Sequence, residues 1–106
     1  AAGGTSAVTR VAAYVPDLMD RSRLLSLPDV TFVGSPDELA GVEADVVVVD
    51  LSRPGVLDLL PSLADRRVVA FGSHVDTALL DAARAAGAEV LPRSRFFADP
   101  GRSLCL

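Results

Sequence analysis

A run of four valines that ends in an aspartate, residues 46–50, constrains the fold of this chain more than any other feature. Consecutive β-branched residues predict a strand that is buried on both faces, as central strands of parallel sheets are. Open parallel sheets bind their ligands beyond the carboxyl ends of their strands. We therefore expect Asp50 to lie at the edge of the sheet where a fold of this kind has its functional site.

Five apolar segments predict strands, and helical segments lie between them. The predicted strands cover residues 11–15, 30–33, 45–50, 67–71 and 89–91, and the predicted helices cover 17–27, 35–42, 55–64 and 73–87. Regular alternation of strand and helix predicts an α/β fold with one doubly wound, five-stranded parallel sheet. The chain length and the central third strand favour the flavodoxin-like strand order 2-1-3-4-5.

Capping residues predict where the helices begin. The expected starts are Asp17 with Asp20 at the third helical position, Ser35 with Pro36 and Glu38, and Ser73 with Asp76. Pro61 should break or kink the third helix, and Gly87 should end the fourth. The apolar face expected for the fourth helix consists of Val75, Leu79, Ala82, Ala83 and Ala86.

The segment after the last strand leaves little room for a full helix. Ser94 could cap a short helix through Phe96 and Phe97, but Pro100 and Gly101 should end it within about two turns. We therefore predict a shortened or missing last helix, which would leave apolar surface near the fourth and fifth strands exposed. Because such patches mark interfaces, we expect a homodimer through the fourth helix, the fifth strand and the Phe96–Phe97 region.

Composition limits the partners and the compartment. We expect residues 1–8 to be a flexible leader or an expression remnant, and residues 9–106 to form one domain. A formal net charge of −4 disfavours nucleic acid and membrane surfaces as partners, and no apolar run approaches the ~20 residues of a membrane span. One cysteine and one histidine exclude an internal disulfide and a Cys- or His-rich metal site. A cytoplasmic location fits this cysteine usage best.

Two motifs at this separation resemble the receiver domain of bacterial response regulators. The sequence DLSRPG at 50–55 is similar to the end of that family's phosphoacceptor strand, and AAGA at 85–88 is similar to the turn that enters its last strand. The resemblance covers residues 11–97. It implies a phosphoacceptor at Asp50 and a Mg²⁺ ion held by this residue and by an acidic pair after the first strand.

Three positions depart from the family's pattern. The acidic pair is Pro16-Asp17, so the resemblance leaves Asp17 and Asp50 as ligands of a weak metal site. The family's hydroxyl position falls on Gly72, with Ser73 beside it, and its lysine position falls on Arg93. Arginine does not replace lysine where a compact ammonium must reach a phosphate oxygen.

Each of these residues also has a structural interpretation. Asp50 could bond to nearby backbone amides instead of accepting phosphate, and Asp17 and Ser73 could serve as helix caps. Ser73, His74 and Arg93 are candidates for phosphate or ligand contact, although a lone loop histidine such as His74 is usually solvated.

The departures favour a non-enzymatic, receiver-like module for regulation or protein interaction in bacterial signalling, with no cofactor beyond a weak Mg²⁺ site. The first alternative is an atypical response regulator that is phosphorylated on Asp50. The second is a flavodoxin-like domain that binds a small molecule or a nucleotide at the helix N-termini above the sheet.

Overall fold

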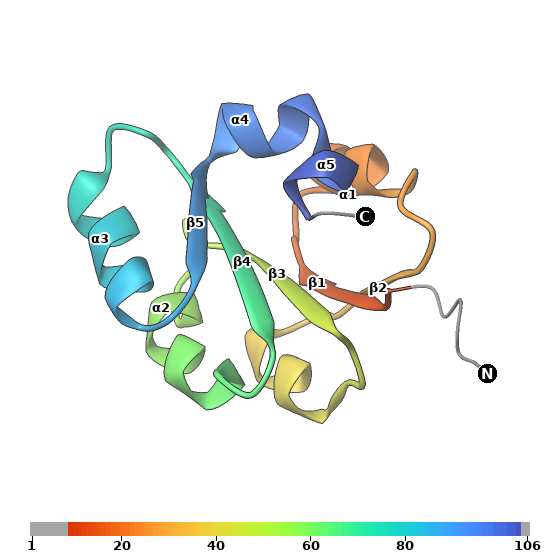
Figure 1. Ribbon diagram of the computed structural model, residues 1–106, viewed down its shortest axis with the longest axis horizontal. Helices are drawn as coiled ribbons and strands as arrows, with labels where there is room; N and C mark the ends of the chain where they lie inside the picture. Colours follow the sequence, from red (N-terminus) through yellow and green to blue (C-terminus); the bar gives the residue numbers. More distant parts are fainter. Residues whose placement is uncertain (1–8, 105–106) are drawn as a thin grey trace.

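Five parallel strands form one sheet in the computed structural model, which describes residues 9–104 (Figure 1). The strands are β1 (Val11–Tyr14), β2 (Val30–Phe32), β3 (Val46–Asp50), β4 (Arg67–Gly72) and β5 (Glu89–Pro92). Their order is β2-β1-β3-β4-β5, with every pairing parallel, which confirms the predicted fold. The predicted leader, residues 1–8, lies outside the described residues.

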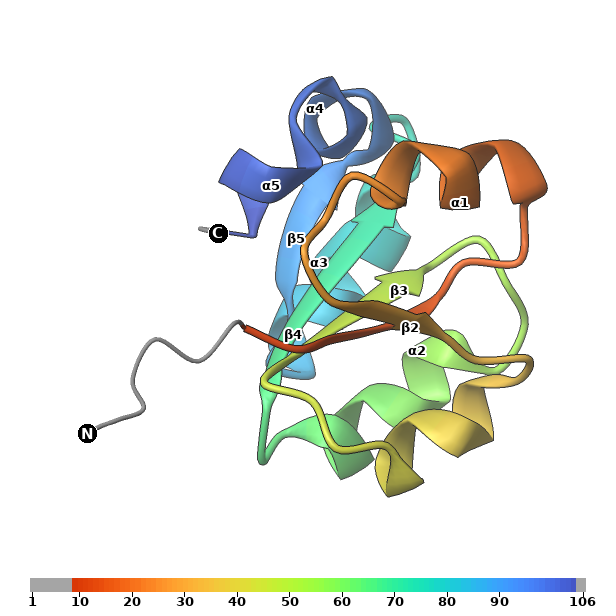
Figure 2. The ribbon, with the colours of Figure 1, turned by 90° about the vertical axis from the view of Figure 1, so that its right-hand side faces the viewer.

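Two layers of helices cover the sheet (Figure 2). One layer contains α1 (Leu18–Leu24), α4 (Arg93–Ala98) and α5 (Pro100–Ser103). The other contains the 3-10 helices η1 (Pro36–Gly41) and η2 (Leu60–Leu63) with the α-helices α2 (Val56–Leu59) and α3 (Thr77–Ala85). No helix in residues 9–104 is long and apolar enough to cross a membrane.

The valines of β3 pack against both helical layers. Because both faces of the strand are buried, apolar residues do not alternate with polar ones. Val46 and Val48 pack with Leu24 and Phe96 beneath the first layer. Val47 and Val49 pack beneath the second layer, in a cluster with Leu39, Leu60 and Leu63. All five residues of β3 are buried, as the sequence predicts for a central strand.

The second and third helical segments begin and break where their sequences indicate. The Glu38 carboxylate accepts hydrogen bonds from the backbone N–H groups of Gly34 (2.9 Å) and Ser35 (2.7 Å), although the helix it starts is a 3-10 helix. At Pro61 the α-helical turn of α2 gives way to η2, because proline cannot donate the next helical hydrogen bond.

The predicted start of the fourth helix is wrong. Helix α3 begins at Thr77, and its N-cap is Asp76, whose carboxylate accepts a hydrogen bond from the Leu79 N–H at 3.3 Å. Ser73 lies three residues earlier in a turn, which shifts the helix and its buried face. Val75 and Ala82 of the predicted apolar face are exposed, while Leu80 is buried with Ala83.

The first helix is shorter than predicted, and the last is broken in two. Helix α1 ends at Leu24 instead of residue 27. Pro100 does not end the helical segment, because it occupies the first turn of α5, where its missing N–H costs nothing. The expectation of an exposed apolar face is wrong, since Phe96 and Leu104 from this segment are 0% and 1% exposed and cover the sheet. The homodimer that was inferred from that exposed face stays a prediction.

Candidate functional site

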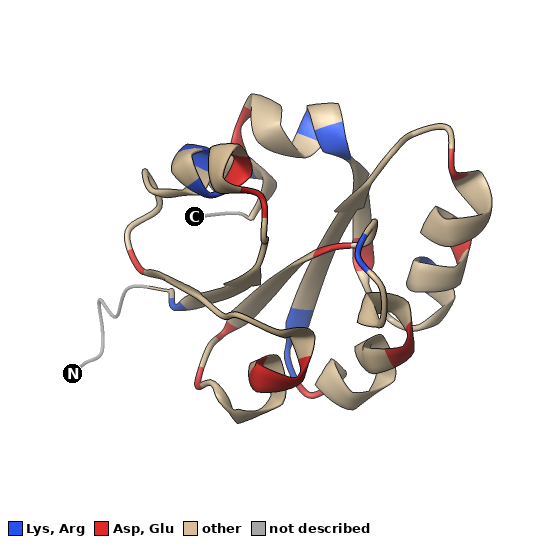
Figure 3. Cartoon of the chain, turned by 180° about the vertical axis from the view of Figure 1, so that it is seen from behind, with Lys and Arg blue, Asp and Glu red and all other residues tan. Residues whose placement is uncertain are grey.

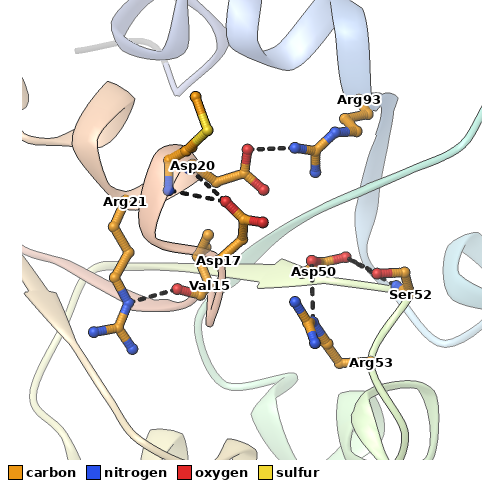
Figure 4. A network of polar contacts seen from close by, with 9 residues as sticks. Val15, Asp17, Asp20, Arg21, Asp50, Ser52, Arg53 and Arg93 are labelled. Carbon is orange, nitrogen blue, oxygen red and sulfur yellow. Dashed lines mark hydrogen bonds and ion pairs between the residues drawn. The ribbon is translucent and has the colours of Figure 1, made fainter.

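Asp50 ends β3 and is 3% exposed, which is unusual for a carboxylate. Its Oδ1 accepts hydrogen bonds from the backbone N–H of Ser52 (2.9 Å) and from the Ser52 hydroxyl (2.6 Å). Its Oδ2 lies 3.7 Å from Nε of Arg53 (Figure 4). The side chain therefore bends back over its own loop, in the manner of an aspartate that stabilises a turn.

The loop after Asp50 brings Arg53 back over the carboxylate. Gly55 has a φ of 83°, a left-handed conformation that glycine adopts without steric cost, and helix α2 starts at the next residue. The Nε atom of Arg53 is buried and has no hydrogen-bond partner, while the side chain as a whole is 40% exposed. The guanidinium thus supplies positive charge to Asp50 without a close hydrogen bond.

Asp17 caps helix α1, as its structural interpretation requires. Its Oδ1 accepts hydrogen bonds from the backbone N–H groups of Met19 (2.9 Å) and Asp20 (3.1 Å). The bond from the Asp20 N–H does most to lower the pKa of Asp17, and Arg93 and Arg53 add smaller attractions. One carboxylate oxygen of Asp17 is therefore committed to the helix end.

A partly buried ion pair joins α1 to the start of α4. Nη2 of Arg93 donates to Oδ1 of Asp20, which is 2% exposed (Figure 4). This bond is the main reason that the pKa of Arg93 is raised, with weaker contributions from Asp50 and Asp17. The guanidinium also lies over the rings of Phe71 (5.6 Å from Cζ to the ring centre) and Phe97 (5.1 Å), within the range of cation–π attraction.

The candidates Ser73 and His74 lie in the exposed loop between β4 and α3. The Ser73 hydroxyl accepts a weak bond from the Val75 N–H at 3.4 Å. Within residues 9–104, no hydrogen bond or ion pair connects either residue to Asp50 or to Arg93. Of the predicted site residues, the structure therefore brings together Asp17, Asp50 and Arg93, while Ser73 and His74 stay on the neighbouring loop.

These residues do not fit a divalent cation in the arrangement that the structure gives them. Mg²⁺ requires near-octahedral oxygen ligands. Oδ1 of Asp17 accepts two backbone bonds, Oδ1 of Asp50 accepts two bonds from Ser52, and Oδ2 of Asp50 faces a guanidinium. Among the described residues, no group of three His, Cys, Asp or Glu side chains could hold a metal ion.

Asp20 and Arg53 are the site residues that sequence reasoning missed. The sequence predicts only a capping role for Asp20, and it leaves Arg53 of the motif either exposed to solvent or directed at a ligand. Asp20 lies two positions after the exposed Leu18, on the side of α1 that also buries Leu24. A carboxylate on the same helical face as a buried leucine was the available signal, because i and i+4 share a face.

Comparison with known proteins supports this geometry at the level of the fold. No family model matches the sequence, and no curated protein matches it. Among solved structures, the isolated REC domain of RcsB from Salmonella enterica serovar Typhimurium, in the apo form, matches with a TM-score of 0.68 at 17% sequence identity. The match covers 92% of this chain and 85% of that chain.

This chain has the receiver-domain fold. The resemblance inferred from the two sequence motifs is confirmed at that level. Because the sequence identity is only 17%, this match shows the fold alone. The chemistry at the carboxyl edge of the sheet depends on the side chains that this chain places there. Those side chains form two arginine–carboxylate pairs, Arg53 with Asp50 and Arg93 with Asp20.

Proposed function

We propose that this chain is a receiver-like signalling module that acts through its surface, without turnover and without Mg²⁺-dependent phosphorylation of Asp50. The observation that carries the proposal is that arginines already neutralise the buried carboxylates at the carboxyl edge. In phosphoryl transfer to an aspartate, bound metal ions normally neutralise the developing negative charge. Here a guanidinium lies where that positive charge would be needed.

The Coulomb attraction between Arg53 and Asp50 supports the proposal. Two opposite unit charges about 4 Å apart attract each other by about 4 kcal/mol at an effective dielectric constant of ~20. Because the Arg53 side chain is 40% exposed, solvent screening reduces that gain. A metal ion that entered beside Asp50 would still have to displace the guanidinium, and Asp17 could offer it only the oxygen that does not cap α1. The buried position of Asp50 and its two bonds from Ser52 further limit its reactivity as a nucleophile.

Incubation with Mg²⁺ and acetyl phosphate, followed by intact-mass measurement, tests the proposal. We expect no mass gain of one phosphoryl group in the natural sequence. A gain that disappears in Asp50→Asn would contradict the proposal and support the alternative of an atypical phosphoacceptor. Arg53→Ala is the informative companion variant, because it removes the competing cation and should allow more Mg²⁺ binding than the natural sequence does.

The remaining alternative is a domain that binds a small molecule or nucleotide. A thermal-shift screen against nucleotides and flavins addresses it, because a ligand at 100 times its Kd stabilises the native state by about 2.7 kcal/mol. A clear rise in melting temperature with one of these compounds would replace the proposed function with this alternative.

A further inference from the structure

Ion pairs divide the ten arginines of this chain into two groups. Outside the layer of α1, α4 and α5, every arginine pairs with a carboxylate: Arg10 with Glu43, Arg53 with Asp50, Arg66 with Asp65, Arg67 with Glu89, and Arg84 with Asp81. Within that layer, Arg93 pairs with Asp20. The others, Arg21, Arg23, Arg95 and Arg102, form no ion pair with any carboxylate of residues 9–104. Unneutralised positive charge therefore gathers on one side of an acidic molecule.

Two shallow hollows lie on either side of α4 and contain most of these arginines. A hollow of about 430 Å³ is lined by Arg23, Arg93, Ser94, Phe97 and Ala98. A second hollow, of about 300 Å³, is lined by Leu91, Arg95, Ala98, Asp99, Arg102 and Ser103. Because Ala98 lines both, the hollows adjoin each other. We call the surface formed by Arg23, Arg93, Arg95 and Arg102 the arginine face.

Aromatic stacking orders part of the arginine face in advance. The guanidinium of Arg23 lies 5.7 Å from the centre of the Phe97 ring, and that of Arg93 lies 5.1 Å from it. Groups held in this way lose less side-chain entropy when they bind a partner. Asp99 also lines the second hollow and offsets part of its positive charge, but no ion pair joins it to an arginine of residues 9–104, and its carboxylate accepts a hydrogen bond from the Arg102 backbone N–H as the cap of α5.

The opposite layer has the opposite charge (Figure 3). Its helices η1, α2 and α3, with the N-cap of α3, carry Asp37, Glu38, Asp58, Asp76 and Asp81 against a single arginine, Arg84. Counted in the same way, with its N-caps, the layer of α1, α4 and α5 carries five arginines against Asp17, Asp20 and Asp99. The charge is therefore separated between the two layers, and an acidic partner is attracted to one of them and repelled by the other. Complementary potentials of this kind orient a partner and accelerate its encounter.

An apolar residue lies beside the arginines. Met19 is 73% exposed and precedes Arg23 by four residues, so the two side chains lie on the same side of α1. A long apolar side chain next to arginines is typical of protein–protein interfaces, in which Met and Arg are enriched. It offers nothing to a purely electrostatic polyanion such as a nucleic acid backbone.

We propose that the arginine face, with Met19 at its edge, binds an acidic segment of a partner protein that also carries apolar side chains. Carboxylates of that segment would pair with the planar guanidinium groups through two parallel hydrogen bonds each. The inference rests on the proposed function, because it names the kind of partner that a module acting through its surface would bind. It does not require Asp50 to be inactive.

Titration of ¹⁵N-labelled protein with a synthetic peptide of glutamate and leucine residues tests the inference. We expect shift changes in the amides of Arg23 and of helices α4 and α5, with few changes in α3. The triple variant Arg23→Gln, Arg95→Gln, Arg102→Gln should bind the peptide roughly tenfold more weakly, since each exposed pair contributes little and three are lost. These side chains are exposed, so the fold should survive, and the same spectra report whether it does.

Arg84→Gln is the matched control, because Arg84 is exposed on α3 and already pairs with Asp81. It removes one positive charge, as each single substitution in the arginine face does, and should leave peptide affinity unchanged. Equal affinity of the triple variant and the natural sequence would overturn the inference. So would tighter binding of a single-stranded oligonucleotide of the same charge, or self-association of the protein through the arginine face in the absence of peptide. No phosphodonor is present, so this result is independent of the test of Asp50.

Discussion

Asp20 connects two elements that are distant in the sequence. Its carboxylate is buried, one of its oxygens pairs with Arg93, and the other, Oδ2, is buried without a hydrogen-bond partner. A buried charge with one empty acceptor is costly, and its attachment to Arg93 offsets that cost. The pair therefore fixes the start of α4 against α1 and keeps the Arg93 side chain close to the candidate site.

Asp20→Asn should lower the free energy of unfolding by about 1–2 kcal/mol. The estimate takes the usual value of a charged hydrogen bond and reduces it because the Arg93 side chain is 44% exposed and can be solvated. Chemical denaturation monitored by circular dichroism measures the change. Asp81→Asn removes an exposed ion pair to Arg84 on α3 and should change the free energy by less than about 0.5 kcal/mol. Equal effects of the two substitutions would contradict this role of Asp20.

The stability of the chain should fall in acid. The pKa of Glu89 is lowered from its ordinary 4.5 chiefly by the hydrogen bond from Arg67, and that of Asp17 from 3.8 chiefly by the bond from the Asp20 N–H. Groups with lowered pKa values in the folded state stabilise it above their unfolded values, and this contribution is lost as the pH falls through the folded values. Melting temperature should therefore drop below about pH 4.5.

Paired variants assign this acid effect to its sources. Glu89→Gln and Asp17→Asn should each melt at a lower temperature at neutral pH and lose less stability on acidification than the natural sequence does. A melting curve that falls with pH equally steeply in the double variant would show that other carboxylates cause the effect.

Helices α4 and α5 together cover the part of the sheet that a single long helix at the end of the chain would cover. Phe96 of α4 is 0% exposed, and its ring stacks on Phe71 of β4 with centres 5.2 Å apart. Phe97 meets both rings edge-on, at 4.9 and 5.0 Å. Leu104 follows α5 and is also buried in this cluster. The broken helix thus covers the sheet with a few large side chains.

Phe96→Ala should cost about 3–5 kcal/mol of unfolding free energy, because it removes a fully buried aromatic ring and leaves a cavity. Denaturant unfolding measures the loss, and Val75→Ala serves as the control, since Val75 is 74% exposed. A loss below about 1 kcal/mol for Phe96→Ala would mean that α4 does not pack on the sheet as described.

The sequence predicted strands better than helix ends, for physical reasons that particular residues illustrate. An apolar run predicts a strand from its local sequence alone, without knowledge of distant contacts. Every strand begins and ends within one residue of its prediction. Ser73 and Asp76 are both good caps, and local sequence could not decide between them. The long-range pair of Asp20 with Arg93 spans 73 residues, so no local pattern could reveal it.

At the scale of the whole molecule, fewer elements are available to the predicted homodimer interface than the sequence indicates. Phe96 is buried and Phe97 partly so, which leaves α3, β5 and the exposed Val75 before α3 as its remaining parts. We expect light scattering at tens of micromolar to report a dimer, and Val75→Asp to shift it toward the monomer. A monomer in the natural sequence at that concentration would contradict the prediction.

The two outer strands of the sheet also determine how copies of this chain can meet. Strand β2 is three residues long, and β5 starts at the charged Glu89 and ends at Pro92, which has no N–H to donate. Short, charged or proline-ended borders are poor templates for another strand. Growth into fibres by backbone pairing is therefore disfavoured even at high concentration, and any assembly has to form through side chains.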